Sequence, residues 1–189
     1  MAMLCRDIGL LFLCVPKTGS TAVARLLKEE FGGEWVPSED LFDDSGRLQC
    51  SKKHCDCDDL LRLGLLSADL LRKLYVVATT RSPFDWLFSQ YYYSRSIYES
   101  EGEFSARAWV KRNLELYRHA AHNDFATHLK RYWLSGARSV SWRWACRANV
   151  VLRHERLAAD LQRIMSQLAS TRSLEIPTVN VTPEKPANV

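Results

Sequence analysis

The sequence predicts an α/β fold with a parallel sheet. Three observations support it: an almost wholly apolar run at 8–15, two further β-like runs at 74–79 and 149–152, and amphipathic stretches with helical spacing between and after them. Runs that are apolar along their whole length are typical of strands buried on both faces of a parallel sheet. Strands that alternate with helices build this class of fold.

The chain of 189 residues is long enough for one domain with a sizeable core. We predict this domain over residues 1–170 and a C-terminal tail over 171–189, which is polar and contains three prolines. A composition of 47% hydrophobic and 25% charged residues argues against a disordered chain. The net charge of +4 is spread over scattered Lys and Arg residues, which favours a small anionic ligand over a nucleic acid.

The cysteines and the N-terminal segment bear on the cellular compartment. The apolar run at 8–15 is too short for a membrane span, and no small-residue cleavage site follows it. The six cysteines are Cys5, Cys14, Cys50, Cys55, Cys57 and Cys146. Cys14 lies within a predicted buried strand, where cysteine behaves as a small apolar residue. We therefore expect reduced thiols and a cytoplasmic protein without a membrane span.

The first third of the chain predicts a helix, a loop and a second helix. Ser20 or Thr21 is expected to cap a helix with apolar residues at helical spacing, and Gly32-Gly33 is expected to end it. Residues 34–53 are polar and predict a long irregular loop. The leucine-rich stretch 56–73 predicts the second helix.

The rest of the chain begins with a clear helix start. After the β run at 74–79, Ser82 is expected to be the N-cap of a helix and Pro83 its first residue. Further helices are predicted over 104–118, 123–135 and 156–168, and a strand over 149–152.

The turn after the first predicted strand has the composition of an anion-binding site. It reads Pro16-Lys17-Thr18-Gly19-Ser20-Thr21, and so places one lysine, three hydroxyls and a glycine at the start of a helix. The first N–H groups of a helix are unpaired and its dipole is positive at that end. Such a turn is suited to hold a phosphate or a sulfate.

The turn is not the P-loop motif of triphosphatases, which requires Gly-x-x-x-x-Gly-Lys-Ser/Thr. Here the lysine precedes the glycine. The other two β runs lead into Thr80-Arg81 and Arg153-His154 instead of an acidic residue that could hold magnesium. A P-loop-like kinase or nucleotide hydrolase remains one alternative, and a non-catalytic module that binds a nucleotide or a sulfated ligand is another.

Three segments, each at a predicted strand-to-helix junction, carry a family resemblance. Pro16–Thr21 resembles the 5′-phosphosulfate loop, and residues 81–91 are similar to the 3′-phosphate element, of the sulfotransferases that use 3′-phosphoadenosine 5′-phosphosulfate (PAPS). Val151–Leu157 resembles the late strand and Glu-x-Leu helix start of that family. The resemblance covers roughly residues 8–160 and implies a P-loop-like three-layer α/β/α fold in a single domain.

The resemblance implies a donor site that needs no metal. PAPS is the implied cofactor, and its 5′-phosphosulfate group is implied to bind at Lys17, Thr18, Gly19, Ser20 and Thr21. Arg81 and Ser89 are implied to hold the 3′-phosphate, the arginine by a charge-assisted fork of hydrogen bonds. Lys17 is also the implied catalytic cation, which neutralises charge on the leaving oxygens.

His54 is the candidate catalytic base. The segment Lys52–Leu60 resembles the histidine and acidic helix of the carbohydrate O-sulfotransferase branch, where that histidine is the proposed base. An imidazole with the ordinary pKa of about 6.5 suits removal of a proton from an acceptor hydroxyl. The alternative is an exposed histidine that only precedes a helix. The implied partner is a small-molecule or glycan acceptor, and sugar, phenol, lipid and peptide all remain open.

The residues Cys50, His54, Cys55 and Cys57 raise the alternative of a zinc site. Their spacing is not a usual structural-zinc pattern, because a second Cys-x-x-Cys pair is missing. We expect free thiols and no metal ligands, with a Cys50–Cys55 or Cys50–Cys57 disulfide as a third alternative.

The C-terminal segment departs from the family pattern. Family members usually carry a basic or glycine-rich segment that closes over the 3′-phosphate, and Lys185 is a poor match to it. The alternatives are a minimal enzyme, a lid supplied by a partner subunit in a homodimer, or reduced activity.

Overall fold

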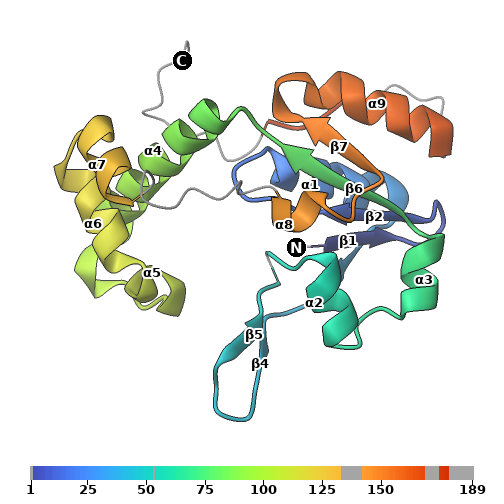
Figure 1. The fold of residues 1–189 in the computed structure, drawn as a ribbon, viewed down its shortest axis with the longest axis horizontal. Coiled ribbons are helices and arrows are strands. Elements are labelled where there is room, and N and C mark those ends of the chain that lie inside the picture. Colours follow the sequence, from blue (N-terminus) through green and yellow to red (C-terminus); the bar gives the residue numbers. More distant parts are fainter. Residues whose placement is uncertain (1, 53, 133–141, 169–174, 179–189) are drawn as a thin grey trace. The chain divides into compact units, whose positions relative to one another are not determined.

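The computed structural model describes residues 2–52, 54–132, 142–168 and 175–178 (Figure 1). The chain divides into two compact units: Met1–Arg81 with Ser141–Val179, and Ser82–Val140 with Asn180–Val189. We call them the first and the second unit. The predicted boundary at residue 170 and most of the predicted tail lie outside the described residues. Within those residues, no helix combines the length and the apolar character that a membrane span needs.

The first unit is built on a five-stranded mixed sheet of order β3-β1-β2-β6-β7. Its strands are β1 (Ala2–Cys5), β2 (Leu10–Leu13), β3 (Glu34–Val36), β6 (Tyr75–Thr80) and β7 (Val150–Arg153). The strands β2, β6 and β7 are parallel, whereas β1 is antiparallel to both β2 and β3. Four strands therefore point one way and β1 points the other way.

The sheet corrects the prediction of a wholly parallel arrangement. The three predicted strands are confirmed as its parallel part, but β1 and β3 were not predicted. β1 is joined to β2 by a tight turn in which the N–H of Gly9 donates to the carbonyl of Arg6, 3.1 Å away, and Gly9 has a φ of 60°. A connection this short can only return the chain antiparallel, because a parallel crossover needs a dozen residues or more.

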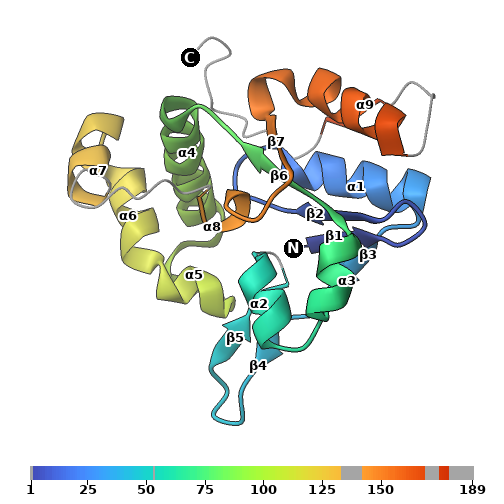
Figure 2. The same ribbon diagram turned by 45° about the vertical axis from the view of Figure 1, so that its right-hand side comes forward.

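Helices cover both faces of this sheet (Figures 1 and 2). One face carries α1 (Ser20–Phe31) and α9 (Leu157–Leu168), which follows β7 through the short 3-10 helix η2 (His154–Arg156). On the other side lie α2 (Cys57–Arg62), α3 (Ala68–Lys73) and α8 (Trp142–Ala145). A small hairpin of β4 (Leu41–Phe42) and β5 (Leu48–Cys50) precedes α2.

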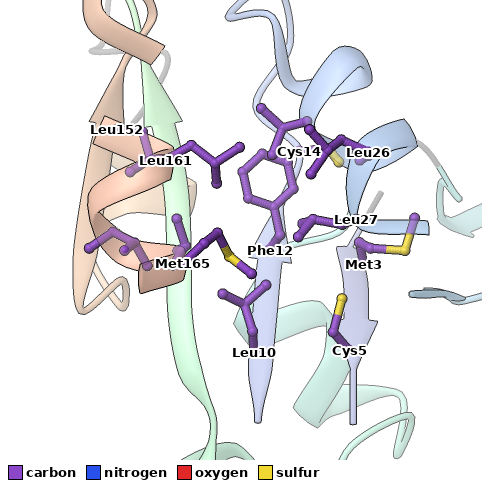
Figure 3. Close-up of a cluster of buried hydrophobic side chains, with 14 of the residues drawn as sticks. Met3, Cys5, Leu10, Phe12, Cys14, Leu26, Leu27, Leu152, Leu161 and Met165 are labelled. Carbon is purple, nitrogen blue, oxygen red and sulfur yellow. The ribbon is translucent and has the colours of Figure 1, made fainter. Parts of the chain in front are cut away.

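The core between the sheet and the pair α1 and α9 is fully apolar (Figure 3). Phe12 projects from β2 into its centre, with Leu26 and Leu27 of α1 on one side and Leu161 and Met165 of α9 on the other. Each of these side chains is at most 3% exposed. Burial of one such side chain contributes roughly 1.5–3 kcal/mol to stability, so this core fixes the two helices against the ends of the parallel strands.

Two local predictions of the first unit were wrong in detail. The leucine-rich stretch 56–73 forms two helices, because Gly64 adopts a φ of 65° and Ser67 then caps α3 by accepting a hydrogen bond from the N–H of Leu70. The predicted loop 34–53 contains β3 and the hairpin β4–β5. The helix end at Gly32 is confirmed, with this glycine in the left-handed conformation.

The second unit is helical in its described part. Its elements are α4 (Pro83–Glu101), η1 (Gly102–Phe104), α5 (Ala108–Arg112), α6 (Leu114–His122) and α7 (Phe125–Tyr132). The long helix α4 packs against both α6 and α7. Pro83 opens α4 as predicted, with Ser82 before it. The helix predicted over 104–118 is divided into η1, α5 and α6, and residues 133–135 of the next predicted helix lie outside the described residues.

Candidate functional site

The turn between β2 and α1 is fixed from inside by one backbone carbonyl. The carbonyl of Val15 accepts hydrogen bonds from Oγ1 of Thr18 and from Oγ of Ser20, each 2.8 Å long. Lys17 and Gly19 both have a positive φ, 63° and 78°. A non-glycine residue rarely adopts this conformation, and it costs roughly 1–2 kcal/mol for a residue with a Cβ. The hydroxyl contacts hold the chain in this shape.

The start of α1 differs from the prediction. Gly19 is the N-cap, and no side chain caps the helix. Ser20 is the first helical residue, and its hydroxyl points back to Val15 instead of to the helix N–H groups. Thr21 is exposed. The first turn of α1 therefore presents backbone N–H groups without a side-chain cap, which is the feature that attracts an anion.

Thr18 joins the turn to the neighbouring strand. Its Oγ1 lies 2.5 Å from Oγ1 of Thr79 in β6, and both side chains are fully buried. Because the Thr18 hydroxyl donates its only proton to Val15, the Thr79 hydroxyl donates to Thr18. Thr18, predicted to contact the donor, thus has its hydroxyl engaged within the first unit, where it locks the turn against β6.

Arg81 brings the second predicted motif to the same turn. It follows Thr80, the last residue of β6, and its guanidinium donates a hydrogen bond of 3.2 Å to the backbone carbonyl of Lys17. Both residues are half-buried. Both residues follow the carboxyl ends of the parallel strands β2 and β6. Ligands of open α/β sheets commonly bind at this end of the strands.

His154, the first residue after β7, brings a third strand-to-helix junction to the turn. A Cβ placed on Gly19 would lie 3.0 Å from Nδ1 of His154 and 3.0 Å from Cδ2 of Leu157. The turn thus packs against the end of β7 and the start of α9. An open depression of about 520 Å³ adjoins this contact, lined by residues 154–159 and Ile176. The order of the parallel strands, which the sequence does not state, is what brings His154 to the turn.

Two predicted site residues lie on other segments. His54 is exposed, in the turn between β5 and α2, and its backbone N–H donates to the backbone carbonyl of Ser51 at 3.1 Å. Ser89 lies in α4 of the second unit, whereas Arg81 ends the first segment of the first unit. The roles expected of His54 and Ser89 stay predictions.

The cysteines are all free in this structure, as expected, and five of the six are buried. Burial raises the pKa of Cys14 to about 12, and burial together with Asp56 raises the pKa of Cys57 to about 12. Thiols with such pKa values are poor nucleophiles at neutral pH. Covalent catalysis by Cys14 or Cys57 is therefore not what this arrangement favours.

No protein-family model, no curated protein and no solved structure matches this chain. The first unit offers uncapped backbone N–H groups at α1 and two cationic residues, Lys17 and Arg81, joined by a hydrogen bond. Such a set can bind a phosphate or sulfate group and stabilise negative charge that develops on it.

Proposed function

We propose that this protein is a sulfotransferase that moves a sulfuryl group from PAPS to the hydroxyl of a small-molecule or glycan acceptor. The observation that supports the proposal most is the hydrogen bond from Arg81 to the carbonyl of Lys17. It joins the segments that resemble the 5′-phosphosulfate loop and the 3′-phosphate element. A nucleotide with phosphate groups at its 5′ and 3′ positions would match the two cationic residues, Lys17 and Arg81, at the carboxyl ends of β2 and β6.

In the proposed reaction, the acceptor oxygen attacks the sulfur in line with the leaving group. A new S–O bond forms as the bond between sulfur and the bridging phosphate oxygen breaks, and 3′-phosphoadenosine 5′-phosphate (PAP) leaves. Lys17 and the N–H groups at the start of α1 would stabilise the charge that grows on the leaving oxygens. His54 would accept the proton of the acceptor hydroxyl. Arg81 would bind the 3′-phosphate.

Calorimetry with PAP, ADP and ATP tests the donor class. We expect PAP to bind at least ~10-fold tighter than ADP, because only PAP offers a 3′-phosphate to Arg81. Equal affinity for PAP and ADP would contradict the proposal. Tight ATP binding with magnesium-dependent hydrolysis would instead indicate the kinase or hydrolase class.

Variants then separate an enzyme from a binding module. His54→Ala is expected to bind PAP as the unchanged protein does but to lose sulfuryl transfer to acceptors identified by screening with labelled PAPS. Lys17→Ala is expected to lose transfer, whereas Lys28→Ala, which removes an exposed lysine from the last turn of α1, should not. PAP binding without transfer to any acceptor class would favour a non-catalytic module.

A further inference from the structure

Two thiols and a carboxylate gather at the start of α2. The Sγ atoms of Cys50 and Cys55 and a carboxylate oxygen of Asp59 all lie within 4.8 Å of one another. The side chains are buried, with exposed fractions of 3%, 0% and 9%. They come from the end of β5, from the connection after it and from the first turn of α2. The cluster thus joins three neighbouring segments, and all three ligands lie between residues 50 and 59 of the chain.

This ligand set has a defined chemistry. Thiolate sulfurs bind Zn²⁺ at about 2.3 Å and carboxylate oxygens at about 2.0–2.2 Å, which places neighbouring ligands of a tetrahedral ion less than about 4 Å apart. The observed cluster needs only a small adjustment to reach that spacing. Soft sulfur ligands select zinc and related ions over magnesium and calcium.

We propose that Cys50, Cys55 and Asp59 bind a thiophilic divalent cation of the zinc class. The proposal does not depend on the sulfotransferase function. Three protein ligands leave one position of a tetrahedral ion for a water molecule. The ion would fix the connection between β5 and α2, which also carries His54.

Polar contacts already hold Asp59, the carboxylate ligand, in place. The N–H of Asp59 donates to Oδ1 of Asp56 at 2.8 Å, and Asp59 Oδ1 accepts from Arg62 at 2.9 Å. Arg143 of α8 pairs with both Asp56 and Asp59. Contacts of this kind orient a ligating carboxylate and raise metal affinity in known sites.

The α8 helix also supports the backbone at the cysteines. The indole N–H of Trp144 donates to the carbonyl of Cys55 at 3.2 Å, and the indole is buried. Cys50 is therefore held as the last residue of β5, and the backbone of Cys55 is held by α8. A cation would not have to order a loose loop, which lowers the cost of binding.

The charges of the cluster allow a cation to enter. Without an ion, the carboxylates of Asp56 and Asp59 balance the guanidinium groups of Arg62 and Arg143, and the thiols are neutral. A divalent ion that displaces the protons of Cys50 and Cys55 adds two positive charges and two thiolate charges. The net charge is unchanged, so no uncompensated charge is buried.

The spacing of cysteines and histidines along the sequence does not indicate this site, because the third ligand is an aspartate. Cys50 and Cys55 are separated by four residues, and Asp59 follows four residues later, on the first turn of α2. Asp59 is also part of an acidic run, where it is easily taken for a solvated surface residue. Only its burial reveals it as a candidate ligand.

Titration of the reduced, chelator-treated protein with Co²⁺ tests the site. We expect one Co²⁺ per chain, a cobalt–thiolate absorption band, and displacement of Co²⁺ by Zn²⁺. Cys55→Ser and Asp59→Asn should each weaken Co²⁺ binding by more than about 100-fold, beyond the effect of losing an outer hydrogen-bond partner. The matched controls are Cys146→Ser, an exposed thiol, and Asp58→Asn, an exposed carboxylate of the same helix, and neither should change binding.

A second measurement uses only the unchanged protein, in case a variant fails to fold. Zn²⁺ should raise the thermal midpoint and Mg²⁺ at the same concentration should not, because a ligand stabilises the state that it binds. The proposal is overturned if the reduced protein shows no cobalt–thiolate band and no Zn²⁺-dependent stabilisation. A second result also overturns it. The protein purified without reductant would contain a Cys50–Cys55 disulfide, and after reduction of that disulfide it would still bind no metal.

Discussion

The guanidinium of Arg81 donates a hydrogen bond to the backbone carbonyl of Lys17 over a sequence separation of 64 residues. This contact joins the ends of two adjacent parallel strands and places a permanent positive charge beside the turn that opens α1. It is the structural basis of the donor site proposed above. The contact also supports the shape of the turn. We therefore expect removal of Arg81 to weaken ligand binding more than it slows the transfer step.

Arg81→Ala is expected to raise the KM for PAPS by about 10- to 100-fold with a smaller change in kcat, because a hydrogen bond to a charged group is worth about 1.5–3 kcal/mol. Steady-state kinetics with varied PAPS measures both constants. Arg72→Ala, which removes an exposed arginine from α3, is the matched control and should leave both unchanged. A KM unaffected by Arg81→Ala would remove this residue from the donor site.

The buried pair Thr18 and Thr79 predicts a measurable coupling. Thr18→Val and Thr79→Val should each destabilise the protein by about 1–3 kcal/mol, because each removes the buried hydrogen bond between the two hydroxyls, and Thr18→Val also removes the hydrogen bond to the carbonyl of Val15. The double variant should lose less than the sum of the two. Chemical denaturation of the four proteins gives the coupling free energy. Thr21→Val, at the exposed neighbour, should change stability by less than about 0.5 kcal/mol.

Replacement of Gly19 by alanine should lower the free energy of unfolding by more than backbone strain alone. Gly19→Ala places a Cβ 3.0 Å from both His154 and Leu157 at a φ of 78°, whereas Gly64→Ala meets nothing within 4 Å at a φ of 65°. Both variants carry the left-handed strain of roughly 1–2 kcal/mol. Only Gly19→Ala adds a steric clash, so it should lower the free energy of unfolding further. Equal losses would show that the contact between the turn and η2 is loose.

The burial of His128 leads us to expect that the folding stability of the protein falls in weak acid. It is 1% exposed, its Nδ1 lies 3.3 Å from Nδ1 of His119, and burial followed by the charge of His119 lowers its pKa to about 4. Between pH 6.5 and 4 the unfolded chain binds a proton at this position and the folded chain does not. Stability contributed by neutral His128 is therefore present above pH 6.5 and is lost as the pH falls towards 4.

The full effect is on the order of 3 kcal/mol, because the pKa falls from 6.5 to about 4 and each pKa unit corresponds to about 1.36 kcal/mol. Urea denaturation at several pH values measures it. His128→Phe keeps a ring among its aromatic neighbours Tyr91 and Tyr132 and should flatten the pH dependence. His122→Gln, at an exposed histidine, should leave the slope as it is. An unchanged slope in His128→Phe would assign the acid sensitivity to other groups.

Thiol labelling should distinguish one cysteine from the other five. Cys146 is exposed, whereas the remaining cysteines are buried. Under native conditions we expect one thiol per chain to react rapidly with a disulfide reagent such as Ellman's, and all six to react after denaturation. Cys146→Ser should abolish the fast phase. A fast phase that persists in this variant would mean that a buried thiol becomes accessible.

The parts of the fold that could be predicted are those with a local signal. The strands β2, β6 and β7 are apolar along their length, and α1 ends at Gly32 because a glycine there accepts the left-handed conformation. β1 could not be predicted, because four apolar residues next to the chain start do not say which strand they pair with. The hairpin β4–β5 has strands of two and three residues, too short for any periodicity.

The candidate site was predictable in composition but not in its internal contacts. The residues of the turn and Arg81 follow from their places at strand ends. The inward orientation of Thr18 does not, because the buried partner Thr79 lies 61 residues away. The packing of His154 on Gly19 depends on the order of strands in the sheet, and no spacing along the chain encodes that order.

The shared acceptor at Val15 has an evolutionary consequence. Because the hydroxyls of Thr18 and Ser20 both donate their protons to that carbonyl, neither is available to donate to a bound anion. Changes at these two positions would therefore alter folding before they alter ligand choice. Divergence towards new ligands would have to begin at proposed contacts other than these two hydroxyls, such as the side chains of Lys17 and Arg81, while Thr18 and Ser20 stay constant.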